Sequence, residues 1–193
     1  MKIQATPDAA EVVRKVIRGE DEAFTQLVRQ WEGRVFNLAL RYLGNREDAQ
    51  DVAQETFLSV FRSIGQLREP ASFRTWLYRI TLNHCRLRWR SSVPEIPLED
   101  TGNTAGSGTP AVSIDEVLQS RSRDPLETKD LIRKGLLGLS QEHRTAVILK
   151  EYLGLSLAEV ADVMDCPLST AKSRLYHGLR GMERTLLRLG ARA

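Results

Sequence analysis

Two helices separated by a tight turn, near the end of the sequence, constrain the fold of this chain more than any other feature. Ser156 is followed three residues later by Glu159, the pattern of a capping box, which starts a helix at the next residue. Pro167 cannot continue that helix and marks a short turn. We expect Ser169 to cap a second helix that runs from Thr170 to about Leu189. This spacing predicts a helix-turn-helix, the motif whose second helix enters the major groove of DNA.

The second of these helices separates an apolar face from a basic and polar face. The apolar residues recur at helical spacing: Ala171, Leu175, Leu179, Met182 and Leu186. The candidate DNA-binding residues are Ser169, Thr170, Lys172, Ser173, Arg174, Tyr176, His177 and Arg180. Among them, Lys172, Ser173 and Tyr176 lie where side chains of a recognition helix reach base edges. The alternative is a solvated basic face on an ordinary helix, but the capping box and the turn favour DNA binding.

The composition is that of a globular protein. Of the 193 residues, 41% are hydrophobic and 27% are charged, which is enough for packed helical cores. The net charge of +3 is too small to indicate nucleic-acid binding without a local cluster of cations. No apolar run reaches the about 18 residues of a membrane span, and the first residues do not resemble a signal peptide. The two cysteines form no metal or disulfide pattern, so we expect a cytoplasmic protein.

Helical signals also dominate the first half of the chain. Proline and polar caps at the starts, and glycines at the ends, predict helices over 7–19, 24–43, 45–65 and 71–90. The third of these has the buried stripe Ala49, Val52, Phe57, Val60, Phe61 and Ile64.

The segment 91–123 has a different character, being rich in proline, glycine and serine. It cannot bury enough apolar surface to fold alone, so we interpret it as a flexible linker, with a weak amphipathic patch at Ile114, Val117 and Leu118. Helical caps return at Asp124 and Ser140. We therefore predict an all-α chain of two small helical domains, 1–90 and 124–193, joined by this linker.

Two segments of the first domain carry unusual side chains. The helix that follows Asn45 has a polar face of Glu47, Asp48, Asp51, Gln54 and Glu55. Acidic residues stabilise a helix N-terminus, but a cluster that continues into the third turn also suits a basic protein partner.

The helix over 72–90 interleaves aromatic residues with arginines, as proteins that hold unpaired nucleic-acid strands do. The alternative is that the aromatic residues form ordinary core, and we expect this of Leu77 and Ile80. Trp76 and Tyr78 cannot both face one core, so at least one of them should lie at a surface.

Four motifs in this order resemble the bacterial RNA polymerase sigma factors of the extracytoplasmic-function (ECF) family, group IV of the sigma-70 superfamily. The motifs span Gly19–Phe24, Asp48–Phe57, Phe73–Asn83 and Thr170–Leu175. The resemblance covers about Glu11 to Leu187 apart from the linker, and the four motifs together are highly specific. It implies that 1–90 is sigma region 2 and that 124–193 is sigma region 4.

The resemblance also implies partners and roles. Region 2 would dock on the clamp helices of core RNA polymerase through Asp48, Asp51, Gln54, Glu55 and Leu58. It would capture the opened −10 element with the loop over 66–71 and with Ser72, Phe73, Trp76, Arg79, Asn83 and Arg86. Region 4 would read the −35 element of promoter DNA and hold the polymerase flap. An anti-sigma factor is a further expected partner.

Two departures from the family pattern affect the second helix of the helix-turn-helix. Ser169 stands where the family often has glycine, and His177, followed by Gly178, stands where an arginine is common. Because of these departures, the family pattern does not predict which −35 sequence this chain prefers.

We expect no enzymatic activity, no cofactor and no metal. The chain has no phosphate-binding glycine loop and no nucleophile elbow, and the adjacent His84 and Cys85 point to different faces of a helix. The alternatives are an operator-binding regulator with a sensor domain and a nucleic-acid-processing enzyme. The first does not explain the acidic and aromatic helices, and the second lacks a metal-binding carboxylate set.

Overall fold

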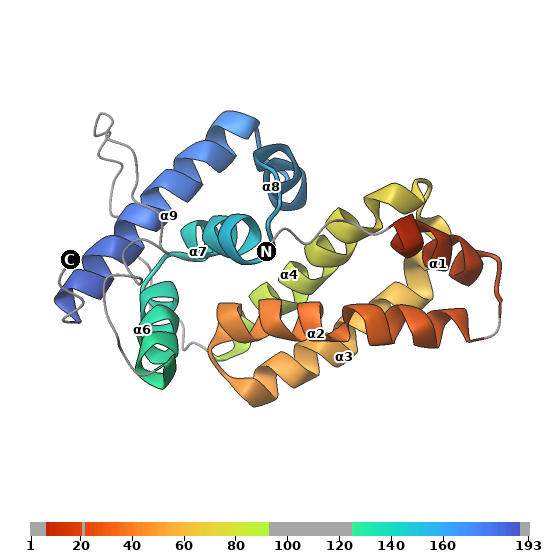
Figure 1. Ribbon diagram of the computed structural model, residues 1–193, viewed down its shortest axis with the longest axis horizontal. Coiled ribbons are helices and arrows are strands. Elements are labelled where there is room, and N and C mark those ends of the chain that lie inside the picture. Colours follow the sequence, from red (N-terminus) through yellow and green to blue (C-terminus); the bar gives the residue numbers. More distant parts are fainter. Residues whose placement is uncertain (1–6, 21, 93–124, 190–193) are drawn as a thin grey trace.

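The computed structural model describes residues 7–20, 22–92 and 125–189, and every regular element in these ranges is helical (Figure 1). The first domain consists of α1 (Pro7–Ile17), α2 (Ala23–Leu43), α3 (Arg46–Ser63), the short turns η1 (Ile64–Gln66) and η2 (Pro70–Ser72), and α4 (Phe73–Ser92). The second consists of α6 (Pro125–Leu137), α7 (Gln141–Val147), the π-helical segment η3 (Ile148–Tyr152), α8 (Leu157–Met164) and α9 (Leu168–Arg188). The predicted all-α class is confirmed. The expected linker beyond Ser92, including its apolar patch, lies outside the described residues.

Local caps position the helices of the first domain. Gly44 ends α2 with a φ of 73°, a left-handed conformation that glycine adopts without strain. The Asn45 side-chain oxygen then accepts hydrogen bonds from the backbone N–H groups of Glu47 and Asp48, at 2.8 and 3.4 Å. These bonds satisfy donors that the start of α3 leaves free. The predicted boundary between the two helices is therefore confirmed.

The core of the first domain lies between α2, α3 and α4. Trp31 packs edge-on against Phe73 and Tyr78, with ring centroids 5.5 and 6.2 Å apart. Phe61 is an exception to the predicted stripe, because its side chain is 65% exposed. It follows the fully buried Val60 and so points about 100° away around the helix. There its ring lies 5.1 Å from that of Phe24, in an edge-to-face arrangement.

In the second domain, α9 crosses α7 at a glycine. A Cβ atom at Gly178 would lie 2.6 Å from Val147 Cγ2 and 2.9 Å from the carbonyl oxygen of His143. The absence of a side chain therefore allows the close approach of the two helices. This contact explains the glycine that follows His177.

Replacing Gly178 with alanine should lower the free energy of unfolding by about 1–3 kcal/mol, because α7 and α9 must move apart. Gly181→Ala is the matched control in the same helix. Its Cβ would meet only the flexible end of Leu139, at 2.6 Å, and alanine favours a helix by about 1 kcal/mol over glycine. Urea unfolding followed by circular dichroism measures both variants. If Gly178→Ala and Gly181→Ala lost the same stability, the close approach of α7 and α9 would not be the reason for glycine at position 178.

Candidate nucleic-acid and protein interfaces

The predicted helix-turn-helix is present as α8, a turn and α9. The Ser156 hydroxyl accepts the N–H of Glu159 at 3.2 Å, and the Glu159 carboxylate accepts the N–H of Ser156 at 2.7 Å. This is the predicted capping box. The start of α9 differs from the prediction: the helix begins at Leu168, with Pro167 at the N-cap position. Ser169 is therefore a residue of the first turn and does not act as the cap.

The outer face of α9 carries the most accessible of the candidate DNA-binding residues. Ser169, Lys172 and Ser173 are exposed. Tyr176 and Arg180 continue the same face one and two turns further on, and the Arg180 guanidinium lies 5.6 Å from the centre of the Tyr176 ring. This face can present a cation, hydroxyls and an aromatic ring to a nucleic acid.

Thr170, Arg174 and His177 share a different side of α9, and the last two contact α7. Arg174 forms a 2.8 Å ion pair with Glu142, and its side chain is 28% exposed. The ring of His177 lies 5.8 Å from that of His143. Burial, followed by the neighbouring His177 and Arg174, holds the pKa of His143 below its ordinary value, so this ring is neutral near pH 7. Arg174 and His177 therefore support the position of α9 as well as being candidate DNA contacts.

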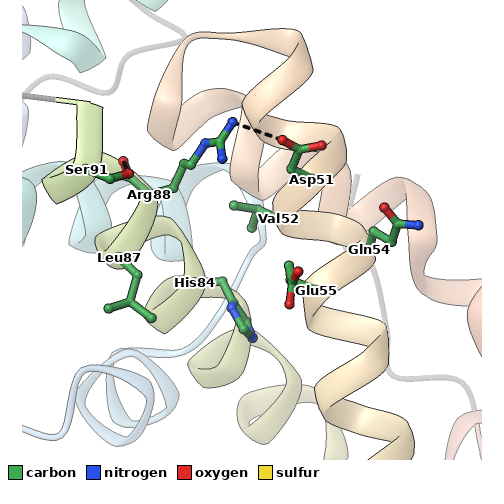
Figure 2. Close-up of a pocket in the computed structure, with 8 residues that line it drawn as sticks. All are labelled: Asp51, Val52, Gln54, Glu55, His84, Leu87, Arg88 and Ser91. Atoms are coloured by element: carbon green, nitrogen blue, oxygen red, sulfur yellow. Dashed lines mark hydrogen bonds and ion pairs between the residues drawn. The ribbon is translucent and has the colours of Figure 1, made fainter.

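The acidic helix α3 presents one continuous surface. Asp51, Gln54, Glu55 and Leu58 are exposed on successive turns. Asp48 is more enclosed, and Arg88 of α4 binds it at 2.6 Å. Arg88 also binds Asp51, at 2.9 Å (Figure 2). Asp48 therefore ties α3 to α4 in addition to lying at the candidate protein surface.

An open groove of about 320 Å³ runs between α3 and α4 beside these acids (Figure 2). Its lining combines acidic, polar and apolar side chains: Asp51, Val52, Gln54, Glu55, His84, Leu87, Arg88 and Ser91. His84 is held by the Ser59 hydroxyl at 2.9 Å, and Leu87 is 62% exposed. The groove thus offers a partner both charge and apolar surface.

The candidate strand-binding residues of α4 do not all share one environment. Phe73 is 2% exposed and belongs to the core, contrary to its predicted role, because it faces Trp31 across the α2–α4 packing. Tyr78 is also buried, whereas Trp76 is partly exposed and lies 6.0 Å from Phe73. Trp76 also packs against the core that contains Tyr78, so the expectation that one of the two lies at a surface is met only by the partial exposure of Trp76. Ser72 and Asn83 are exposed.

Arg79 and Arg86 face the second domain. Arg79 binds the Asp162 carboxylate of α8 at 2.9 Å. Arg86 lines a cleft of about 380 Å³ together with Arg90 of α4 and Arg174 of α9. These α4 cations therefore lie where the two domains meet.

Arg144 of α7 is a central residue that sequence reasoning missed. It is 1% exposed, and its guanidinium donates to the carbonyl oxygens of Tyr42, Leu136, Leu137 and Leu139 at 2.7–3.0 Å. It also lies 4.5 Å from the centre of the Trp89 ring. Nothing in its local sequence distinguishes it from a surface arginine, because its partners come from three other parts of the chain.

The described residues contain no cluster of side chains that could hold a metal ion and no helix able to cross a membrane. Burial raises the pKa of the Cys85 thiol to about 12, which leaves this thiol unreactive.

Comparison with known proteins covers both domains. Residues 27–93 match the family model for Sigma-70 region 2, and residues 129–182 match that for Sigma-70, region 4. The chain is 32% identical over 181 residues to the RNA polymerase sigma-H factor of Pseudomonas aeruginosa, covering 91% of this chain and 92% of that protein. It is 30% identical to the ECF RNA polymerase sigma factor SigW of Bacillus subtilis, covering 90% of this chain and 94% of that protein.

Two solved structures are similar in fold. CnrH in complex with the cytosolic domain of CnrY has a TM-score of 0.66 at 22% identity, covering 92% of this chain and 96% of that chain. The sigma factor RpoE of Bartonella quintana, in complex with the anti-sigma factor NepR, has a TM-score of 0.59 at 19% identity. The match covers 86% of this chain and 97% of that chain. An operator-binding regulator with an unrelated sensor domain would not match across both halves. The chain belongs to the ECF RNA polymerase sigma factors of the sigma-70 family.

Proposed function

We propose that this sigma factor directs core RNA polymerase to promoters by binding promoter DNA at two points. Helix α9 would bind the −35 duplex, and α4 would bind the opened −10 strand. The observation that carries the proposal is the outer face of α9, where Ser169, Lys172 and Ser173 are exposed. A helix-turn-helix presents such a face to base edges in the major groove. The domain division 1–90 and 124–193 assigns one contact point to each domain.

The −10 contact is assigned to the exposed side of α4 and to the residues just before it. Ser72, Trp76 and Asn83 are at least partly accessible there, and Arg79 and Arg86 supply positive charge. A base turned out of the duplex costs a few kcal/mol, which stacking on an aromatic ring offsets. Phe73 is left out of this role because it is buried, and its ring lies 6.0 Å from that of Trp76.

Protein partners are assigned to two further surfaces. The α3 face with Asp51, Gln54, Glu55 and Leu58 suits the clamp helices of polymerase, and the second domain suits the flap. An anti-sigma factor is a further proposed partner, because the similar RpoE of Bartonella quintana is in complex with one. The protein would act in the cytoplasm as a binding subunit without covalent chemistry of its own.

Transcription in vitro with core polymerase on a randomised promoter library tests this function. We expect enrichment of two sequence blocks at a fixed spacing, and transcription that depends on the added chain. Tight binding of the chain to DNA alone, without association with polymerase or stimulation of transcription, would refute the proposal.

Replacing Trp76 with alanine should reduce promoter opening by roughly tenfold while leaving polymerase binding nearly unchanged. Loss of one base–aromatic stack costs about 1–3 kcal/mol, and tenfold corresponds to about 1.4 kcal/mol. Permanganate reactivity of the −10 region measures opening, and co-purification with core polymerase measures binding. Trp76→Phe, which keeps an aromatic ring, is the control and should retain most opening. Equal loss of opening and binding in Trp76→Ala would show that this residue is only part of the core.

A further inference from the structure

Two histidines face each other where α7 crosses α9. The rings of His143 in α7 and His177 in α9 have centroids 5.8 Å apart and are tilted by 35° to each other. The His177 ring also meets the ring of Tyr176, 5.4 Å away and edge to face. Histidine is the side chain whose ordinary pKa, about 6.5, lies closest to neutral pH. The crossing therefore brings two titratable rings into one contact.

The tight packing at Gly178 fixes the separation of the two rings. A Cβ atom at Gly178 would lie 2.9 Å from the carbonyl oxygen of His143, so the backbone that follows His177 rests directly on α7. The rings cannot move apart by a shift of the helices without loss of this packing. Two imidazolium groups held this close repel each other. A proton on one ring therefore disfavours a proton on the other.

The charges nearest to the pair are Glu142 of α7 and Arg174 of α9. They form an ion pair with each other at 2.8 Å. Burial, His177 and Arg174 lower the pKa of His143, and Glu142 acts in the opposite direction. The ion pair thus spends the one nearby carboxylate on an arginine rather than on an imidazolium.

More distant charged groups come from α9 itself, from α4 and from the turn after α8. Arg180, three residues beyond His177, pairs with Glu183 of the same helix at 3.8 Å. α6 packs on α9 further along, around Met182. The cleft beside Arg174 adds three further charged side chains: Arg86, Arg90 and Asp165. Cations outnumber carboxylates among these groups, so the surroundings disfavour extra positive charge on the pair.

His177 lies at the border between this contact and the outer face of α9. Its side chain is partly exposed, and the exposed Ser173 precedes it by one turn of the helix. A recognition helix in the major groove has DNA phosphates along its flanks, and side chains there bind phosphates rather than bases. A neutral imidazole donates one hydrogen bond, whereas an imidazolium donates two and carries a positive charge. A phosphate beside His177 therefore favours the protonated ring.

We propose that the His143–His177 pair couples binding of the −35 duplex to proton uptake, with His177 as a phosphate-binding group and His143 as its positioning residue. This inference rests on the proposed function of α9. Without DNA, the neighbouring ring and the surrounding cations oppose protonation of the pair. In the complex, the phosphate charge offsets this repulsion and His177 takes up a proton. Because the bound state holds the extra proton, affinity for the −35 duplex rises as the pH falls through the range in which histidine titrates.

The coupling within the pair is tested by NMR of the full-length free chain. The sequence contains three histidines, His84, His143 and His177, so their ring signals can be followed separately through a pH titration. We expect His143→Gln to move the titration midpoint of His177 to higher pH, and His177→Gln to do the same for His143, because each variant removes a neighbouring imidazole. Unchanged midpoints in both variants would overturn the coupling.

The link to DNA is tested by binding of the holoenzyme to a promoter from the randomised library, at constant ionic strength between about pH 6 and pH 8. His177→Arg is the matched control, because arginine keeps its charge over this range and its profile reports the other titrating groups of the complex. Relative to this control, wild-type affinity should rise by about threefold to tenfold from about pH 8 to pH 6, since uptake of one proton allows at most about tenfold per pH unit. Circular dichroism at each pH verifies that the variants remain folded.

The position of the pH profile separates the positioning role of His143 from a merely structural one. His143→Gln should keep the rise in affinity but displace it to higher pH, whereas loss of a structural contact would lower affinity equally at every pH. Parallel profiles for the wild type and His177→Arg would overturn the proposal even if the two rings titrate together. Absence of a −35 footprint at every pH would instead refute the proposed function of α9, and the DNA step of this proposal with it.

Discussion

Replacing Arg144 with alanine should lower the free energy of unfolding by about 4 kcal/mol. The guanidinium is buried, and its removal leaves the carbonyls of Tyr42, Leu136, Leu137 and Leu139 without their donor. A buried acceptor that loses its partner costs about 1–3 kcal/mol, and water entering the vacated space recovers part of the sum. Urea unfolding of the full chain, followed by circular dichroism, measures the change.

Two controls separate the hydrogen-bond network from charge alone. Arg144→Lys keeps the positive charge but lacks the planar fork that reaches several carbonyls at once, so it should recover only part of the stability. Arg133→Ala removes an exposed arginine that pairs with Asp130 on the same helix, and it should change stability little. If Arg144→Ala were no less stable than Arg133→Ala, the buried network would contribute nothing to the fold.

The helix boundaries of this chain could be predicted because their signals are local. The bonds of Asn45 reach only two and three residues along the chain, and the Ser156–Glu159 capping box spans three. Gly44 likewise adopts its left-handed conformation at the end of its own helix. Such features depend on neighbours in sequence, so residue types and spacing suffice to identify them.

The environment of individual side chains was less predictable because it depends on how the helices pack. Phe61 and Phe73 have the same residue type and both lie on amphipathic helices, yet one is 65% exposed and the other 2%. A helical wheel does not show which neighbouring helix covers a position, and Phe73 is covered by Trp31 of α2. Ser169 was misplaced for a different reason: α9 begins directly after Pro167, two residues earlier than a serine cap at position 169 requires.

Contacts between the domains could not be predicted from sequence at all. Arg79 and Asp162 are 83 positions apart, and Arg144 and Tyr42 are 102 positions apart. Arg79 is a predicted contact of the −10 strand, and its side chain is 43% exposed on α4. Its contact with α8 depends on how the two helical domains pack against each other, for which the sequence carries no periodic signal.

Replacing Lys172 with alanine should weaken binding to the −35 duplex by about 1–3 kcal/mol, or roughly fivefold to 150-fold, if the ammonium group contacts a base edge. Lys172 is exposed, and it has no ion pair or hydrogen bond in the part of the chain that the structure describes. Its removal should therefore leave the fold intact and act on DNA alone. Binding of the holoenzyme to promoters from the library, together with footprinting of the −35 region, measures the effect.

The salt dependence of this variant distinguishes the two ways in which Lys172 can act. Loss of a base contact relaxes the preference at one position of the −35 element, whereas loss of a phosphate contact weakens all sequences alike and reduces the salt slope by about 1. Arg188→Ala is the control, because Arg188 is an exposed cation at the far end of α9. Its loss should leave the footprint unchanged. An unchanged affinity and footprint for Lys172→Ala would show that this residue does not contact the −35 element. The contact would then be assigned to another side of α9, where Arg174 and His177 lie beside α7.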